Sequence, residues 1–175
     1  MICEKLKSTL QSLFPAIEPV PTPAPPPEDE QGAKTKTPTP PRENGLMERD
    51  YSIHGYHLDA QVSTAQLVEA VTILDDAEFF LESITGVDWI ADNQLEVVYD
   101  FCRYDFDLCR VVIRTRVDRK APVVPTITGV YAGANWHERE THDFFGIKFS
   151  GHPHLIPLLL PEDADFHPLL KDFKA

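Results

Sequence analysis

Apolar and polar residues alternate along three short segments of the chain, and this pattern predicts strands. Residues 56–62 alternate in this way and indicate a strand with one buried face. Residues 94–103 and 108–117 show the same alternation on either side of a short stretch rich in aspartate. These two segments therefore predict a β-hairpin.

The register of this hairpin follows from its apolar faces. The two faces coincide if Phe101 lies opposite Cys109, which implies a loop of odd length around Asp105. Cys102 and Cys109 then point to opposite faces of the sheet, because successive side chains of a strand alternate. We therefore expect no disulfide between these two cysteines.

Apolar residues at helical spacing predict two helices between the first strand and the hairpin. Residues 63–66 form a capping box, so the first helix is expected to begin there. Asp75 or Asp76 is a candidate N-cap for a second helix, which would end at Gly86.

A third helix and an extended arm are predicted for the C-terminal part. Asn135 is a candidate N-cap and Gly146 a candidate helix end, so residues 136–145 are expected to be helical. Four prolines after residue 149 exclude a long helix and favour an extended arm. The apolar run at residues 155–160 of this arm must be covered by another surface.

The N-terminal quarter of the chain has a different composition. Residues 2–14 are amphipathic at helical spacing, but a helix of this length is marginal alone. Ten of the 16 prolines follow within residues 15–41, which favours a disordered tether. A second interpretation is that the helix docks on a neighbouring subunit and the tether sets its reach. The chain is thus divided into an N-terminal segment (1–14), a proline-rich linker (15–47) and one folded domain (48–175) whose arm starts near residue 148.

The net charge of −12 limits the partners of the chain. A nucleic-acid-binding domain needs a basic surface, and anionic lipid would repel so acidic a chain. Arg110, Arg114 and Arg116 share one face of the second hairpin strand. They either form a solvated edge or face a partner, and the sequence leaves both open.

The cysteines and the hydropathy pattern indicate where the chain resides. The three cysteines lack metal-ligand spacing and are too few for a disulfide scaffold, so a reducing compartment is the simpler interpretation. No apolar run suits a signal peptide or reaches the ~20 residues that span a bilayer. We expect a chain that only a partner subunit would hold at a membrane.

The histidines of the C-terminal part are the first candidates for metal ligands. His137 and His142 are five residues apart and would diverge by about 140° on a helix, so they do not suit one metal ion. His152, His154 and His167 lie in an irregular segment. We interpret all five as structural histidines and expect no metal site.

The charged residues of the third helix have an ordinary explanation. A spacing of four would let Glu138 pair with His142, and Arg139 pair with Asp143. No set of nucleophile, base and orienting group is visible, and there is no phosphate-binding glycine loop or iron–sulfur cysteine cluster. We therefore expect no catalytic residue and no cofactor bound by this chain.

One segment carries a specific resemblance. Residues 138–147 read Glu-Arg-Glu-Thr-His-Asp-Phe-Phe-Gly-Ile. They match the hallmark Glu-Arg-Glu-x-x-Asp-aromatic-aromatic-Gly-Ile of the thirty-kilodalton subunit of NADH:quinone oxidoreductase (respiratory complex I) and of related energy-converting hydrogenases. The resemblance covers roughly residues 56–173, and further matching motifs lie at residues 133–136, 151–153, 158–163 and 167–172.

The chain also departs from the family pattern. Ile156 and Pro157 stand where the family usually has two basic residues. Ala164, Phe166 and Leu170 replace a usual aromatic residue, glycine and arginine. These differences leave room for the hydrogenase branch.

The resemblance implies an α+β fold, with helices on one face of a small mixed sheet and a C-terminal arm that wraps a partner. It implies a non-catalytic peripheral-arm subunit on the cytoplasmic side of the cell membrane. The implied partners are the large quinone-site subunit and the small iron–sulfur subunit, and the iron–sulfur clusters and flavin would lie in partner subunits. The alternative is the equivalent scaffold subunit of a membrane-bound [NiFe] hydrogenase, linked to ferredoxin, formate or CO.

The resemblance also implies which residues face the partner subunits. They belong to the third helix and the arm: Glu138, Arg139, Glu140, Asp143, Phe145, Gly146, His152, Pro161, Glu162, Asp163, His167 and Pro168.

Overall fold

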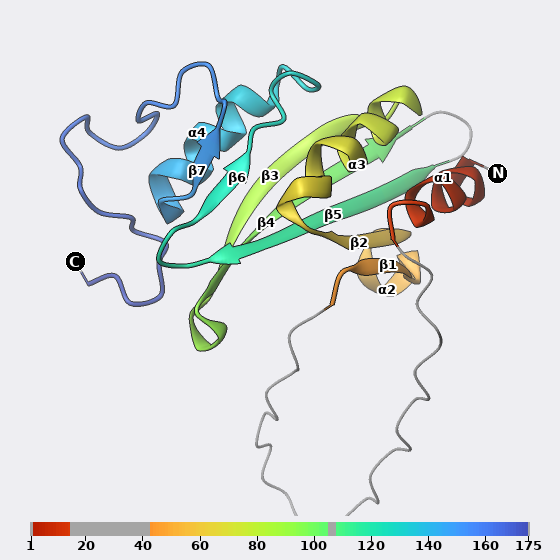
Figure 1. The fold of residues 1–175 in the computed structure, drawn as a ribbon, viewed down its shortest axis with the longest axis horizontal. Helices are drawn as coiled ribbons and strands as arrows, with labels where there is room; N and C mark the ends of the chain where they lie inside the picture. The colour runs from red at the N-terminus through yellow and green to blue at the C-terminus, as the bar shows by residue number, and fades with distance from the viewer. Residues whose placement is uncertain (1, 15–42, 105–107, 175) are drawn as a thin grey trace, which may run out of the picture.

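The computed structural model describes residues 2–14, 43–104 and 108–174. Most of the linker predicted for residues 15–47 therefore lies outside the described residues. The described part forms a main sheet covered by helices, with a small two-stranded sheet near it (Figure 1). The α+β class implied by the resemblance is confirmed.

The main sheet is mixed and has the strand order β1-β2-β5-β4-β3. Strands β2 and β5 are parallel, and the other neighbours are antiparallel. Strand β1 already begins at residue 45, before the domain boundary expected at residue 48. The strands are β1 (Gly45–Glu48), β2 (Leu58–Val62), β3 (Phe80–Trp89), β4 (Gln94–Arg103) and β5 (Cys109–Asp118).

Three helices pack on one face of this sheet: α1 (Ile2–Gln11), α3 (Thr64–Asp76) and α4 (Ala134–Phe145). Their apolar side chains form one core with alternate residues of β4 and β5. Two single turns, α2 (Tyr51–His54) and the 3₁₀ helix η1 (Ile90–Asp92), connect strands. In the part of the chain that the structure describes, no helix has the length and apolar character needed to cross a bilayer.

The hairpin of β4 and β5 is confirmed, with a corrected register. Phe101 pairs with Val111, and Cys109 pairs with Arg103, so the predicted pairing of Phe101 with Cys109 is wrong. The faces are nevertheless right, because both pairings leave odd-numbered residues on the same side. Cys102 therefore points away from Cys109 and is a buried free thiol.

The second predicted helix is wrong, because the residues before Gly86 form strand β3. Asp76 ends α3 instead of starting a new helix. The chain then turns at Glu78, which has φ 61°, and enters β3 at Phe80. In the strand, Gly86 leaves room for the ring of Phe145, since a Cβ there would lie 2.4 Å from the Phe145 Cδ2 atom.

Helix α1 packs against its own domain. Leu6 and Leu10 are buried in the core between α1 and α3. Cys3 of α1 forms a disulfide with Cys109 of β5. The expectation that these two cysteines stay reduced is therefore corrected. Their positions are so far apart in the chain that sequence spacing carries no sign of the pairing.

The second face of the main sheet carries an ion-pair layer. Arg114 Nε lies 3.0 Å from Asp59 Oδ1, and Arg116 Nε lies 2.9 Å from Glu96 Oε1. Both carboxylates are buried, and the Arg116 guanidinium lies over the Trp89 ring at 4.5 Å. These arginines do not form a sheet edge, because β5 lies in the middle of the sheet.

A two-stranded parallel sheet joins α4 to the rest of the domain. It consists of β6 (Val123–Pro125) and β7 (Lys148–Ser150). The arm expected from about residue 148 thus starts with a strand, and residues 151–174 contain neither helix nor strand. Helix α4 is capped by Gly133, not Asn135, while its predicted end at Gly146 is confirmed by a φ of 73°.

Candidate functional site

Helix α4 carries the acidic residues of the hallmark motif, and Asp143 binds the arm. Its Oδ2 atom accepts hydrogen bonds from the backbone N–H groups of Leu158, Leu159 and Leu160 at 2.8, 2.7 and 3.1 Å. Burial alone would raise the pKa of Asp143, but these three donors hold it below its ordinary value. The carboxylate therefore stays charged and fixes the apolar run of the arm onto the helix.

Glu138 is fully buried on the same helix and binds the segment before it. It accepts hydrogen bonds from the Thr126 hydroxyl and from the Ile127 N–H, the latter at 2.8 Å. Burial raises the pKa of Glu138 to about 7, although these two donors act against the shift. The His152 ring lies 4.0 Å from the Glu138 carboxyl. Burial lowers the pKa of His152, so its imidazole is favoured in the neutral form.

Arg139 holds the middle of the arm through the backbone. Its guanidinium donates to the carbonyl oxygens of Ile156 and Pro157 at 3.0 and 2.9 Å, and it lies over the ring of Trp136. The predicted helix pairs, Glu138 with His142 and Arg139 with Asp143, are both wrong. The side chains bind the arm and the preceding turn because those backbone groups need partners when they are covered.

The end of the arm returns to α4 at its C-terminus. The His167 Nδ1–H donates to the Asp143 carbonyl at 2.8 Å, and its ring packs where a Cβ on Gly146 would lie. Asp88 of the main sheet accepts from the Lys171 N–H at 2.8 Å and binds Arg119. The arm is therefore attached to its own domain at both ends.

Comparison with known proteins identifies the family. Residues 60–175 match the sequence model described as the respiratory-chain NADH dehydrogenase, 30 Kd subunit. The chain belongs to this family. It is 42% identical over 120 residues to the C subunit of NADH-quinone oxidoreductase from Roseiflexus sp. (strain RS-1), and the match covers 66% of this chain and 68% of the relative. It is also 40% identical over 94 residues to the C subunit of F(420)H(2) dehydrogenase from Methanosarcina mazei, covering 53% of this chain and 59% of the relative.

Two solved structures share the fold of this 30 Kd-family chain. One is from the structure of the membrane-bound sulfane sulfur reductase, an archaeal respiratory membrane complex, with a TM-score of 0.60 and 27% identity over 67% of this chain and 71% of that chain. The other is the trypsin-resistant fragment of Nqo5, with a TM-score of 0.55 and 29% identity over 64% of this chain and 89% of that chain.

The structure divides the predicted interface residues of the family into two groups. The first group holds α4, β3 and the arm together, while the second group is exposed. The first group is Glu138, Arg139, Asp143, Phe145, Gly146, His152 and His167. The second group is Glu140, Pro161, Glu162 and Asp163, and Pro168 is half-buried.

Exposed apolar residues are missing from the predicted set. Trp136 and Leu159 each expose 61% of their surface, and Leu169 exposes 53%. The apolar run at residues 155–160 signals such a surface, but the sequence does not say which of its members are exposed. Ile156 and Phe166 are further exposed apolar side chains of the arm.

Proposed function

We propose that this chain is a non-catalytic subunit of the peripheral arm of a complex-I-type NADH:quinone oxidoreductase. Helix α4 and the arm dock on the large quinone-site subunit and on the small iron–sulfur subunit beside it. The family membership and the respiratory complexes named for its relatives support this role. Iron–sulfur clusters and flavin belong to the partner subunits, which hold the chain at the cytoplasmic side of the membrane.

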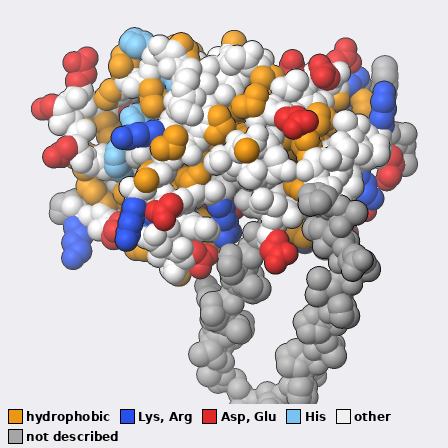
Figure 2. Space-filling model, in the orientation of Figure 1, with side chains coloured by type: hydrophobic (Ala, Val, Ile, Leu, Met, Phe, Trp, Pro, Cys, Tyr) orange, Lys and Arg blue, Asp and Glu red, His pale blue; other side chains and the backbone are white. Residues whose placement is uncertain are grey.

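One observation carries the proposal: the carboxylates of Glu138 and Asp143 on α4 are directed inward, and apolar groups are left outside. Asp143 and Glu138 are occupied by backbone donors of this chain. Trp136, Leu159 and Leu169 remain exposed around them. In Figure 2, hydrophobic side chains and histidines lie together at the end of the molecule that carries α4 and the arm. Exposed aromatic and aliphatic side chains on a rigid support are typical of docking surfaces.

The docking role is tested by purifying the tagged full chain from native membranes in mild detergent and identifying its companions by mass spectrometry. The substitution Leu159→Glu should lower the recovered quinone-site subunit by about tenfold or more, because it places a charge in an apolar contact. Val68→Glu is the matched control, since Val68 is an exposed apolar residue of α3. Equal recovery for both variants would refute the proposed surface.

Arg139 tests whether the support of the arm matters for assembly. Arg139→Ala removes two hydrogen bonds to the arm and the contact with Trp136. We expect the amount of assembled complex to fall, while the turnover of each assembled complex stays unchanged. Normal complex yield with this variant would contradict the proposal.

A second candidate function differs from the first in its electron donor and acceptor. Relatives of this chain include a subunit named for F(420)H(2) dehydrogenase, so the family is used with more than one donor. The alternative is the same scaffold role in a membrane-bound [NiFe] hydrogenase. Co-purification of an NADH-oxidising flavoprotein supports the first assignment, and a nickel-binding large subunit without the flavoprotein supports the second.

A further inference from the structure

The disulfide between Cys3 and Cys109 joins the first turn of α1 to the start of β5. Cys109 is fully buried, whereas Cys3 is partly exposed. A small thiol or disulfide therefore reaches the sulfur of Cys3 first. The N-terminal end of a helix also favours a thiolate over a thiol, because its N–H groups carry partial positive charge.

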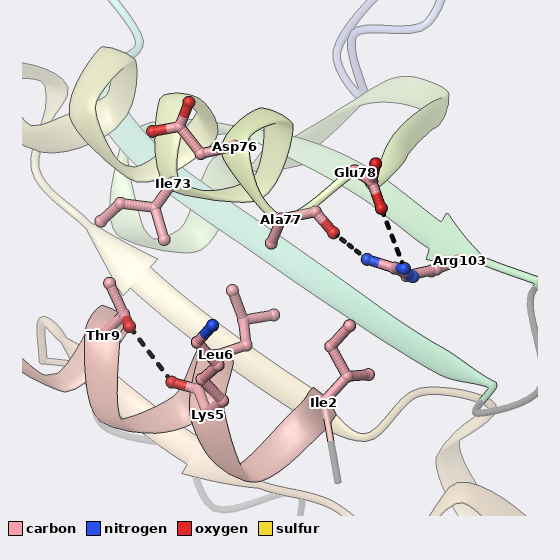
Figure 3. Close-up of a pocket in the computed structure, with 9 residues that line it drawn as sticks. All are labelled: Ile2, Lys5, Leu6, Thr9, Ile73, Asp76, Ala77, Glu78 and Arg103. Atoms are coloured by element: carbon pink, nitrogen blue, oxygen red, sulfur yellow. Dashed lines mark hydrogen bonds and ion pairs between the residues drawn. The ribbon is translucent and has the colours of Figure 1, made fainter.

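Helix α1 is anchored unequally along its length. Leu6 and Leu10 are buried in the core and Phe14 follows them, whereas Ile2 and Cys3 of the first turn are only partly buried against it. One face of α1, with Ile2, Lys5, Leu6 and Thr9, lines a groove of about 440 Å³, and the C-terminal end of α3 borders its other side. Figure 3 shows Ile2 and Lys5 on one side of this hollow, facing residues at the end of α3. The covalent bond at Cys3 therefore holds a turn whose apolar side chains are only partly buried.

We propose that Cys3 and Cys109 form a reversible thiol–disulfide site, which exchanges with low-molecular-weight disulfides such as glutathione disulfide. Its oxidised state fixes the first turn of α1 on the domain. Its reduced state releases this turn and opens the groove. This inference is independent of the docking role of α4 and the arm.

The exchange proceeds in two balanced steps. The Cys3 thiolate attacks one sulfur of glutathione disulfide, and a mixed disulfide forms while one glutathione thiolate leaves and takes a proton from water. The Cys109 thiolate then attacks the Cys3 sulfur and releases the second glutathione. Two electrons pass from the cysteine pair to the small disulfide, and excess glutathione drives the reverse reaction.

His57 is a positioning residue of this site. A ring nitrogen of His57 lies within 4.8 Å of both sulfur atoms. Its Nδ1 accepts the Arg110 N–H at 3.1 Å, so a neutral ring carries its proton on Nε2. The N–H donor of the ring is therefore Nε2, and in this proposal it hydrogen-bonds the thiolate when the disulfide opens.

The same hydrogen bond argues against a metal site at these residues. Two cysteines and a histidine are a ligand set that zinc accepts. A neutral imidazole binds metal through its unprotonated nitrogen, and here the Nδ1 lone pair is already occupied by the Arg110 N–H. Metal binding by the imidazole of His57 would have to break its hydrogen bond with the Arg110 N–H.

The test places the full chain in buffers that differ in the ratio of reduced to oxidised glutathione. Alkylation and peptide mapping identify the cross-link, and hydrogen exchange reports on α1. In the wild type and in the control Cys102→Ala, reduction should raise exchange about tenfold or more at the amides of residues 6–9, which donate to carbonyls of the first turn, without changing α3. Cys3→Ser should exchange equally fast in both buffers. His57→Gln, which can still accept the Arg110 N–H, should slow disulfide exchange by about threefold or more.

Three results would overturn the proposal. Equal protection of α1 in oxidised and reduced buffer would show that the bond does not control the helix. A cross-link that includes Cys102 would show a different pairing. One equivalent of zinc that protects Cys3 and Cys109 from alkylation in the reduced chain would establish the metal site instead.

Discussion

Glu138 and Asp143 show how one helix shifts two carboxyl groups in opposite directions. Both are buried, so the number and type of their hydrogen-bond donors decide the outcome. Asp143 has three backbone N–H donors, and its pKa is lowered. Glu138 lies deeper in the core with one backbone donor and one hydroxyl, and its pKa is raised to about 7. Ionisation of Glu138 therefore lowers the stability of the folded protein.

The buried carboxyl of Glu138 should make stability depend on pH. Its folded pKa of about 7 exceeds the ordinary value of 4.5, so the protonated form is favoured by folding. The stabilisation is complete below pH 4.5 and is lost as the pH rises through 7. Relative to Glu138→Gln, the wild type should lose roughly 3 kcal/mol of unfolding free energy across this range. Urea denaturation of both chains at several pH values measures the difference.

The comparison with the glutamine variant removes the opposing contribution of His152. The pKa of His152 is lowered by burial, so its effect on stability falls in the same pH range with the opposite sign. His152 is present in both chains, and repeating the comparison in a His152→Gln background removes the coupling between these two neighbouring side chains. A difference that stays constant between pH 4.5 and 7 would show that Glu138 is ionised in the folded protein throughout.

Gly86 should be intolerant of a methyl group. A Cβ at this position would lie 2.4 Å from Phe145 Cδ2, so the ring that joins α4 to β3 must move. We expect Gly86→Ala to lower the unfolding free energy by roughly 1 to 3 kcal/mol. Gly129→Ala is the control, because a Cβ there meets nothing within 4 Å. Equal stability of the two variants by denaturation would contradict the packing.

At the scale of elements, the hairpin of β4 and β5 could be predicted from the sequence. The helices bury one face of each strand, so apolar residues are required at every second position. The alternation of apolar residues in β4 and β5 records that burial directly. Strand β3 could not be predicted, since its start depends on the positive φ of Glu78, a residue with no preference for that region. The end of α4 is visible in Gly146, but its start at Gly133 has no side-chain cap.

The site could be predicted in position but not in its contacts. Spacing along a helix identifies neighbours at four residues, and on that basis Arg139 pairs with Asp143. Their actual partners are backbone groups of the arm at residues 156–160, which only the fold brings near. The Cys3–Cys109 bond has a sequence separation of 106 and is likewise a property of the folded chain.

Asp143 should control the attachment of the arm as an element. Asp143→Asn removes the charge that accepts three backbone N–H groups, so the unfolding free energy should fall by roughly 2 kcal/mol. Hydrogen exchange at residues 158–160 should increase, while exchange in β4 should follow only the global stability. Asp163→Asn is the control, because this arm carboxylate is exposed. Unchanged exchange at residues 158–160 would show that the arm is held by its apolar contacts alone.

At the scale of the whole molecule, segments from both ends of the chain stabilise one sheet. Helix α1 covers the start of β5 through Cys3. The arm reaches Asp88 through the Lys171 N–H, and Arg119 binds both Asp88 and Asp172 of the arm. The faces of the sheet differ, one being apolar under the helices and the other an ion-pair layer around Glu96. A sheet whose two faces are both occupied in this way can present α4 and the arm in a fixed orientation.

The long covalent loop should make a large part of the global stability depend on redox state. The disulfide closes a loop with a sequence separation of 106. In the chain-entropy description, a loop of about 100 residues stabilises the fold by roughly 4 to 5 kcal/mol, because it restricts the unfolded chain. Urea denaturation of the wild type should therefore show a loss of about this size when reductant is added. Cys3→Ser should unfold at the same urea concentration with and without reductant. A wild type that is equally insensitive to reductant would mean that the bond is not formed in the folded chain, and α1 would then be held by non-covalent contacts such as those of Leu6, Leu10 and Phe14.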